Sequence, residues 1–200
     1  LQCRSIVVSA GTFMRGLLHV GLRNQAGGRL GDGVSNLSEA LRDLGFEIGR
    51  FKTGTPCRLN GRSIDFTQCV RQDGDTEVQP FTYLPQRLTR RSADLFSLNE
   101  WKDGLFHVEQ QPCWATQTSP ETHEIIRDNL GRSPLYAGVI EGTGPRYCPS
   151  IEDKVVRFAD KSHHQLFLEP EGRHTGEYYV NGASTSLPYE VQYRFIRSIP

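Results

Sequence analysis

The chain has 200 residues, and its 23 Lys and Arg side chains balance its 23 Asp and Glu side chains, which gives a formal net charge of zero at neutral pH. This length allows one large domain or two smaller parts with a substantial core. Balanced charge argues against a polybasic nucleic-acid binder, because neutralising phosphates requires a local excess of Lys and Arg. A confined basic patch stays compatible with this composition.

The cysteines are odd in number and form no C-x-x-C pair: Cys3, Cys57, Cys69, Cys113 and Cys148. Neither a disulfide framework nor a zinc site is indicated, and a reducing cytosol is the simpler context. No apolar run approaches the roughly 18 to 20 residues that span a bilayer, and the amino terminus lacks a signal pattern. We therefore expect a soluble cytoplasmic protein with no metal and no membrane partner. The absence of an initiating Met and the uncapped last helix indicate an internal fragment.

The first quarter of the chain contains four recognisable segments. The β-branched run Ser5–Ser9 predicts a buried strand, and the alternation over Phe46–Lys52 predicts another. Between them, Ser35–Gly45 has leucines at helical spacing, with Ser able to cap its start and Gly its end. The Gly-rich stretch Gly27–Gly33 predicts a loop. It lacks the spacing of a nucleotide fingerprint, so a plain loop and a phosphate cradle both stay open.

A long polar section follows, from about Gln68 to Gln111. It shows no sustained period, and a connection of this length inside a compact domain is commonly functional or mobile. Its basic cluster, Gln86–Arg91, fits either a solvated surface or an RNA contact.

The second half of the chain alternates between strand patterns and helix patterns. Cys113–Thr118, His164–Gly172 and Glu177–Gly182 predict strands, the last ending in an Asn-Gly turn. Ser119–Gly131 predicts a helix with a Ser cap, a Pro in its first turn and a Gly stop, and Pro188–Ile199 predicts another. Interleaved strands and helices place the chain in the α/β or α+β class.

One cysteine has surroundings that can activate a thiol. Cys148 follows Arg146, and Ser150 can cap a short helix in which Asp153 completes a capping box. The amino end of that helix favours an anion, which suits a thiolate or, with the glycines of Glu141–Arg146, a dinucleotide pyrophosphate. The alternative is a buried, packed thiol, and local physics leaves both interpretations open.

The segment GPRYCPSIEDKVVRF, which contains this cysteine, closely resembles the signature of the MnmG (GidA) family of flavoproteins. Other stretches resemble the same family in the same order: VVSAGTFMRGLLHVG, GGRLGD, SEALRDLGFEIGRFKTGTP, HEIIRDNLGRSPLYAGVIEG, FLEPEG and STSLP. The resemblance thus extends over nearly the whole chain. Members of the family modify the wobble uridine of certain tRNAs.

The resemblance implies an α/β fold in two parts. Residues 1–52 correspond to part of a FAD-binding domain of the glutathione-reductase type. Residues 53–200 correspond to an inserted α/β domain associated with NADH binding, with the long polar loop at about 68–111. Two local departures concern loop geometry: Gly33 and Val34 stand where the family has two prolines, and Cys57 stands where it commonly has a second Pro.

The resemblance also implies an activity. FAD, NADH and methylenetetrahydrofolate, the one-carbon donor, serve to add a carboxymethylaminomethyl or aminomethyl group at uridine C5. The implied partners are tRNA and the GTPase MnmE, with a homodimer inside a heterotetramer. Two alternatives stay open: a non-catalytic NADH- or tRNA-binding and assembly module, and the related folate-dependent tRNA uridine methyltransferase.

The family's functional residues carry over to two places. Cys148 corresponds to a catalytic cysteine, as nucleophile or as acid/base. The implied cofactor-binding residues are one FAD-contacting serine and the segment associated with NAD: Ser35, Gly144, Pro145, Arg146, Tyr147, Cys148, Pro149, Ser150, Ile151, Glu152, Asp153, Lys154, Val155, Val156, Arg157 and Phe158.

Overall fold

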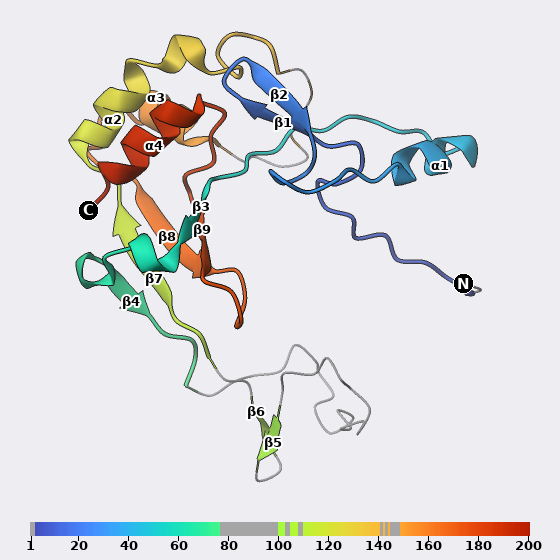
Figure 1. The fold of residues 1–200 in the computed structure, drawn as a ribbon, viewed down its shortest axis with the longest axis horizontal. Coiled ribbons are helices and arrows are strands. Elements are labelled where there is room, and N and C mark those ends of the chain that lie inside the picture. Colours follow the sequence, from blue (N-terminus) through green and yellow to red (C-terminus); the bar gives the residue numbers. More distant parts are fainter. Residues whose placement is uncertain are drawn as a thin grey trace.

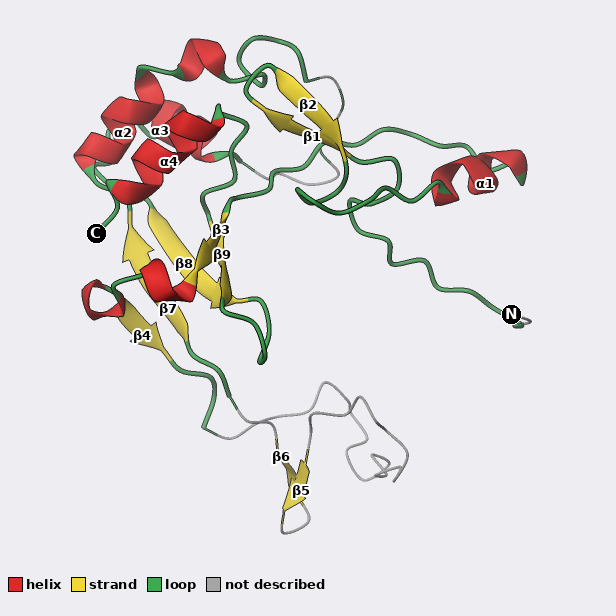
Figure 2. Ribbon diagram, in the orientation of Figure 1, coloured by secondary structure: helices red, strands yellow, loops and turns green. Residues whose placement is uncertain are grey.

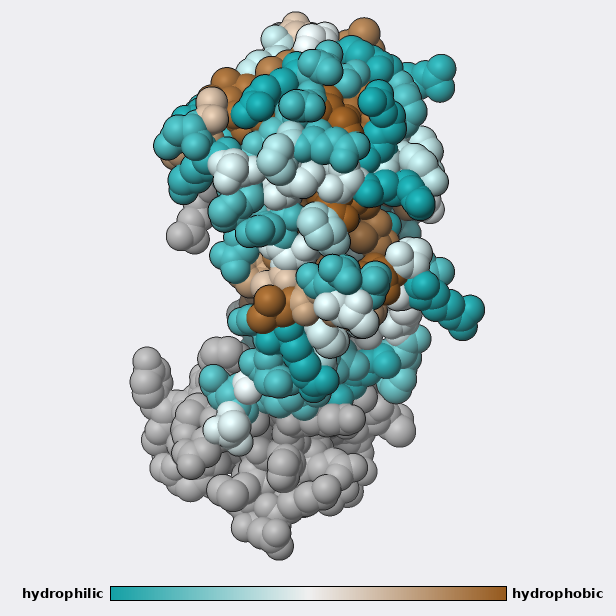
Figure 3. All heavy atoms as spheres, turned by 90° about the vertical axis from the view of Figure 1, so that its left-hand side faces the viewer, coloured by the Kyte–Doolittle hydropathy of each residue, from teal (hydrophilic) through white to brown (hydrophobic). Residues whose placement is uncertain are grey.

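The structure is a computed structural model that describes residues 3–76, 100–102, 105–107, 110–140, 142, 144 and 149–200. Figure 1 shows a five-stranded sheet with helices gathered at one of its ends, a hairpin beside those helices, and a first helix that lies away from both. The face seen in Figure 3 is mostly hydrophilic and carries small, separate hydrophobic areas.

The sheet is antiparallel throughout and has the strand order β3-β9-β8-β7-β4. Its register places Leu168 between Trp114 and Val180 on the neighbouring strands. Its strands are β3 (Arg58–Asn60), β4 (Val70–Gln72), β7 (Cys113–Gln117), β8 (Gln165–Pro170) and β9 (Glu177–Asn181). A separate hairpin pairs β5 (Glu100–Lys102) with β6 (Leu105–His107).

Three helices pack together at the end of the sheet: α2 (Pro120–Arg127), α3 (Ile151–Arg157) and α4 (Tyr189–Arg197) (Figure 2). Their shared core is formed by apolar side chains that are almost completely buried, among them Ile126, Ile151, Val155, Val191 and Phe195. A second core lies on the sheet around Leu166, Leu168, Val180 and Ala183. Ile196 of α4 packs against both cores, so this helix joins the helical layer to the sheet.

Local signals explain where the helices begin. The Ser119 hydroxyl accepts the Thr122 N–H (3.1 Å), the Thr122 hydroxyl accepts the Ser119 N–H (3.1 Å), and Pro120 takes the first helical position. The predicted helices over 119–131 and 188–199 are confirmed. Helix α2 ends at Arg127, earlier than Gly131, because residues Leu130–Arg132 form a 3-10 turn.

The first quarter contains the hairpin β1 (Leu17–Val20) and β2 (Arg23–Ala26), then the Gly-rich loop, then α1 (Leu37–Asp43). The loop and the helix confirm their predictions. Gly45 has a φ of +90° and follows the C-cap, as expected for a helix stop. The N-cap is Asn36 instead of Ser35, whose hydroxyl still accepts the Leu37 N–H (3.2 Å).

Two strand predictions are wrong. Ser5–Ser9 and Phe46–Lys52 form no strand, and apolar side chains in both, such as Val7 and Phe51, are exposed. A strand needs a neighbour to pair its backbone groups, and no strand of the described residues pairs with either segment, although Phe51 makes an isolated bridge. Conversely, β1 to β4 are only three or four residues long, too short for a periodic signal.

The fold class is confirmed as mixed α and β, and the described strands pair in an antiparallel manner. The division at residue 52 stays a prediction, although every strand of the five-stranded sheet follows it. The basic cluster Gln86–Arg91 lies outside the described residues. None of the described helices has the length and apolar character that crossing a membrane requires.

Candidate functional site

The predicted NAD-associated segment is described only in part. Pro145, Arg146, Tyr147 and Cys148 lie outside the described residues, whereas Gly144 and residues 149–158 lie within them.

The start of α3 is closed by the predicted capping box. The Ser150 hydroxyl accepts the Asp153 N–H (3.1 Å), and the Asp153 carboxylate accepts the Ser150 N–H (3.2 Å). The Ile151 N–H donates to the Ser184 carbonyl (2.7 Å). The N–H groups of Ser150, Ile151 and Asp153 already have hydrogen-bond partners and are not free to bind an anion. An anion beside this end of the helix would therefore be attracted mainly by the partial positive charge of the helix.

Other side chains of the segment divide between core and surface. Ile151 and Val155 are completely buried in the helical core, whereas Val156 and Phe158 are exposed. The Lys154 ammonium donates to the Gly182 carbonyl (2.9 Å), which ties α3 to the turn after β9. The helix is thus held by contacts on several sides.

Glu152 is a buried acid at the centre of this arrangement. Its Oε1 accepts three hydrogen bonds, from the Ser133 hydroxyl (3.2 Å), the Thr185 hydroxyl (3.0 Å) and the Ser186 N–H (3.2 Å). Its Oε2 is buried without a partner among the described residues. Burial raises the pKa of this carboxyl, and the hydrogen bonds oppose that shift only in part.

The loop 184–187 is a junction between distant parts of the chain. Besides binding Ile151 and Glu152, it accepts the Gly21 N–H at the Ser186 carbonyl (2.7 Å) and donates from the Thr185 N–H to the Thr55 carbonyl (3.3 Å). The turn between β1 and β2, the segment before β3, and the start of α3 therefore meet at one loop. The sequence does not indicate this role, because the residues that meet here come from four separate segments.

A histidine pair connects α2 with the start of β8. The rings of His123 and His164 stack with centroids 5.0 Å apart. The Thr118 hydroxyl lies 2.8 Å from His123 Nε2 and accepts the His164 N–H (2.8 Å). Burial is the main cause that lowers the pKa of both imidazoles.

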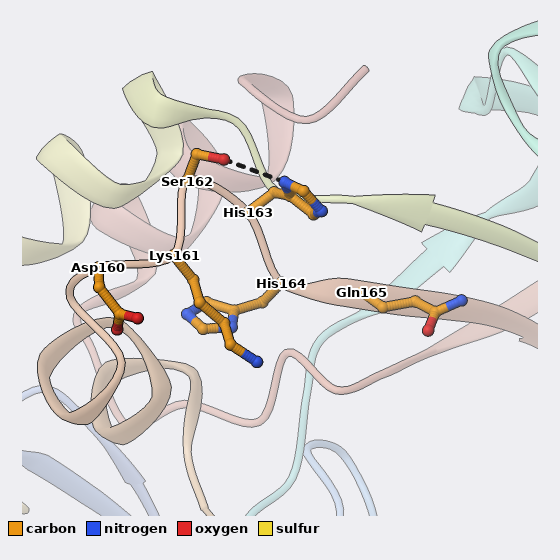
Figure 4. A pocket seen from close by; sticks show the side chains of 6 residues that line it. All are labelled: Asp160, Lys161, Ser162, His163, His164 and Gln165. Carbon is orange, nitrogen blue, oxygen red and sulfur yellow. Dashed lines mark hydrogen bonds between the residues drawn. The ribbon is translucent and has the colours of Figure 1, made fainter.

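His164 also lines an open pocket, in which His163 lies on the opposite side of the chain and hydrogen-bonds to Ser162 (Figure 4). His164 Nε2 is buried without a partner among the described residues. The pocket is lined by Asp160, Lys161, Ser162, His163, His164 and Gln165.

In three of the described cysteines, burial disfavours the reactive thiolate form. It raises the pKa of Cys57 to about 11, an effect that neighbouring Arg58 offsets only in part. Burial likewise raises the pKa of Cys69 and of Cys113. Within the described part of the chain, no group of three or more His, Cys, Asp or Glu side chains is placed to hold a metal ion.

Ser35 lies elsewhere, between the Gly-rich loop and α1, and no described contact joins it to residues 149–158. Its N–H donates to the Phe13 carbonyl (2.8 Å), and its carbonyl accepts the Arg15 N–H (2.9 Å). A Cβ atom built on Gly31 or Gly33 would find nothing within 4 Å. Both glycines are exposed, so the backbone of the loop that precedes Ser35 is accessible.

Comparison with known proteins places this arrangement in a family. A family model described as glucose inhibited division protein A matches residues 1–200. The tRNA uridine 5-carboxymethylaminomethyl modification enzyme MnmG of Geobacter metallireducens is 55% identical over 196 residues, which cover 98% of this chain and 28% of that protein. The protein of the same name from Pelobacter propionicus is 51% identical over 197 residues.

A solved structure agrees with these matches. Aquifex aeolicus GidA in its form I crystal aligns with a TM-score of 0.70 and 47% identity, covering 96% of this chain and 30% of that chain. This chain spans about 28% of the length of the curated relatives that it matches. Because the family model matches the chain from its first residue to its last, the chain belongs to the glucose inhibited division protein A (GidA) family.

Proposed function

We propose that this chain supplies cofactor-binding and catalytic residues to an enzyme that adds a carboxymethylaminomethyl or aminomethyl group at C5 of the tRNA wobble uridine. The observation that carries the proposal is the 51 to 55% identity, over nearly the whole chain, to relatives named tRNA uridine 5-carboxymethylaminomethyl modification enzyme MnmG. Identity at this level supports a shared reaction for the proteins that contain these segments.

The chemistry requires a group that activates the base. NADH reduces FAD, methylenetetrahydrofolate supplies the one-carbon unit, and glycine or ammonia supplies the amine that completes the added group. Uridine C5 is a poor nucleophile until a group adds at C6, and a cysteine thiolate can make that addition. We assign this role, or that of an acid/base, to Cys148. Residues 149–158 follow directly, and the capping box with its buried neighbours fixes the start of α3, whose N-cap Ser150 lies two residues after this cysteine in the sequence.

Ser35 is our candidate for the contact with FAD. Its hydroxyl accepts the Leu37 N–H and keeps its own proton available for a ligand. The open backbone at Gly31 and Gly33 supports a large group at this edge. The NAD-associated contacts are proposed for residues 144–158.

The proposed partners follow from the same membership. We propose that tRNA is the substrate, that the GTPase MnmE is the protein partner, and that the protein forms a homodimer within a heterotetramer in the cytoplasm. Equal numbers of acidic and basic side chains favour a confined tRNA contact over a uniformly basic surface.

The test uses the full-length protein that contains this chain, expressed in cells lacking their own copy. Cys148→Ser should abolish wobble-uridine modification, measured by mass spectrometry of tRNA nucleosides, with a loss of at least about 100-fold. Cys113→Ser is the matched control and should retain modification, because burial keeps that thiol protonated. Wild-type modification in the Cys148 variant would rule out its catalytic role.

A second candidate concerns the 200-residue chain by itself. Because it spans about 28% of its relatives, it can act as a binding and assembly module without turnover. Purified chain should then bind NADH or tRNA while showing no flavin absorbance and no modification of tRNA. A flavin spectrum in the purified chain would contradict this second candidate.

A further inference from the structure

Two arginines and two glutamates join the Gly-rich loop to the start of β3, to the turn between β8 and β9, and to the first residue of β9. Arg29 binds both carboxylate oxygens of Glu177 through Nη2 (2.7 and 2.6 Å) and Oε2 of Glu171 through Nη1 (3.1 Å). Arg58 binds the other oxygen of Glu171 (2.8 Å). We call these four residues the Arg29 cluster. It connects residues that are 142 and 148 positions apart in the sequence.

The cluster is more than one exposed ion pair. Arg58 and Glu171 keep 24% and 18% of their side-chain surface exposed, whereas Arg29 and Glu177 keep 33% and 44%. Arg58 also donates to the Thr55 hydroxyl (2.9 Å) and lies over the Tyr179 ring. Shared, partly buried charge pairs fix geometry better than isolated surface pairs, which contribute little.

Arg29 lies in the middle of a loop that is fixed at both ends. At one end, the Gly27 N–H donates to the Gly16 carbonyl (2.9 Å). At the other end, Ser35 pairs with the backbone of Phe13 and Arg15. Within the loop, the Asp32 N–H donates to the Arg29 carbonyl (3.1 Å). The cluster therefore holds the loop at its centre, six residues before Ser35.

We propose that Arg29 is a positioning residue that holds the Gly-rich loop against the β8–β9 turn and the start of β9, and thereby sets the position of Ser35 for FAD. The inference rests on the proposed function for its cofactor, and on the contacts of the cluster for its geometry. It makes the flavin contact dependent on Glu171 and Glu177, which belong to the part of the chain after residue 52.

The competing role for Arg29 is direct binding of a cofactor phosphate. Both of its Nη atoms already bind carboxylate oxygens of Glu171 and Glu177. A phosphate would have to displace these partners and bring its own negative charge beside two carboxylates. The geometry therefore favours positioning over direct contact.

The experiment uses full-length protein with Arg29→Gln, Glu177→Gln, and both changes together. Because both changes break the same contact, each single variant should weaken FAD binding roughly tenfold, and the double variant should be no weaker than the weaker single one. Affinity is measured by fluorescence titration of the apoprotein. Arg42→Gln is the control, because Arg42 is exposed and the described residues show no ion pair for it.

A second measurement needs no cofactor. Hydrogen exchange at the Asp32 and Ser35 amides of the apoprotein should accelerate in Arg29→Gln and in Glu177→Gln and stay unchanged in Arg42→Gln. Unchanged exchange in the first two variants would overturn the proposal. So would weaker FAD binding in Arg29→Gln with normal binding in Glu177→Gln, which indicates direct contact.

The two measurements also separate this inference from the proposed function. If wild-type protein binds no FAD, the proposed function fails and the role of Arg29 toward FAD fails with it. If hydrogen exchange at Asp32 and Ser35 were still faster in Arg29→Gln and Glu177→Gln, Arg29 would hold the Gly-rich loop in place but would have no role in binding FAD. If wild-type protein binds FAD and the Glu177 variant binds it equally well, the proposed function stands and the positioning role is wrong.

Discussion

At Glu152, burial and hydrogen bonding act in opposite directions on one carboxyl group. Three donors converge on Oε1, which favours the charged form, while complete burial and an unpartnered Oε2 disfavour it. Burial is the larger effect, so the pKa of Glu152 is raised. A protonated carboxyl keeps Oε1 as an acceptor for Ser133, Thr185 and Ser186 and avoids a buried charge.

The first prediction concerns the pH dependence that this acid imposes. A raised pKa in the folded state contributes stability that is complete below the unfolded pKa, near 4.5, and is lost as pH rises through the folded pKa. Glu152→Gln keeps the acceptor and cannot ionise. Between pH 5 and pH 8, its free energy of unfolding should therefore rise relative to wild type.

Urea unfolding across this pH range measures the difference. Glu152→Ala is the comparison variant, because it leaves the three donors without their acceptor and should cost about 2 kcal/mol or more. A constant difference between wild type and Glu152→Gln from pH 5 to pH 8 would show that Glu152 has no raised pKa.

At the scale of elements, the sequence predicts those structures whose causes are local. Helices α2 and α3 begin at capping boxes, and α4 begins after Pro188, so each carries its start signal within a few residues. Strands depend on partners elsewhere. Ser5–Ser9 has strand composition but no partner among the described strands, whereas β3 is only three residues long and pairs with β9.

In the candidate site too, local contacts can be predicted from the sequence and contacts between distant residues cannot. The capping box of Ser150 and Asp153 is predictable because its partners are three residues apart. The partners of Glu152 are 19 to 34 residues away, and nothing in the sequence near Glu152 indicates them. The partners in the Arg29 cluster are more than a hundred residues apart in the sequence, so only the folded structure shows that they meet.

The second prediction concerns the contact between α2 and the start of β8. A histidine whose folded pKa is lowered contributes stability that is complete above the unfolded pKa, near 6.5, and is lost as pH falls toward the folded value. Lys154, Lys161 and His163 lower the pKa of His164 further, and a backbone hydrogen bond at Lys154 opposes this only in part. The His164 ring and Arg127 lower the pKa of His123 further. Protonation therefore weakens this contact.

Wild-type protein should lose stability between pH 7 and pH 5.5 more steeply than His164→Gln, measured by thermal unfolding at fixed ionic strength. His174→Gln serves as the control, because His174 is exposed after β8, and it should follow wild type. Equal slopes for wild type and His164→Gln would contradict the assignment. This effect is opposite in sign to that of Glu152, so only comparison with each variant separates the two.

At the scale of the whole molecule, two groups of hydrogen bonds among the described residues join the first quarter of the chain to later segments. One is the Arg29 cluster, formed by charged side chains. The other is the loop 184–187, where backbone groups of Gly21 and Thr55 bind directly. The charged contacts fix the position of the Gly-rich loop. The backbone contacts at the loop 184–187 fix the β1–β2 turn and the start of α3 relative to each other.

The third prediction tests the close approach at the loop 184–187. A Cβ atom on Gly54 would lie 2.6 Å from Cβ of Ser184, an atom that can move only with its backbone. Gly54→Ala should therefore destabilise the protein by about 1 to 3 kcal/mol. Gly49→Ala is the matched control, because a Cβ there meets nothing within 4 Å, and it should be neutral or slightly stabilising.

Chemical unfolding gives the energies, and hydrogen exchange locates them. Because the Thr185 N–H donates to Thr55 and the Ile151 N–H donates to Ser184, both amides should exchange faster in Gly54→Ala and remain protected in Gly49→Ala. A clash that separates these segments also removes the support of Glu152 through Thr185. If the Gly54 variant were as stable as the Gly49 variant, the loop 184–187 would not be the tight junction that joins the start of α3 to the segment before β3.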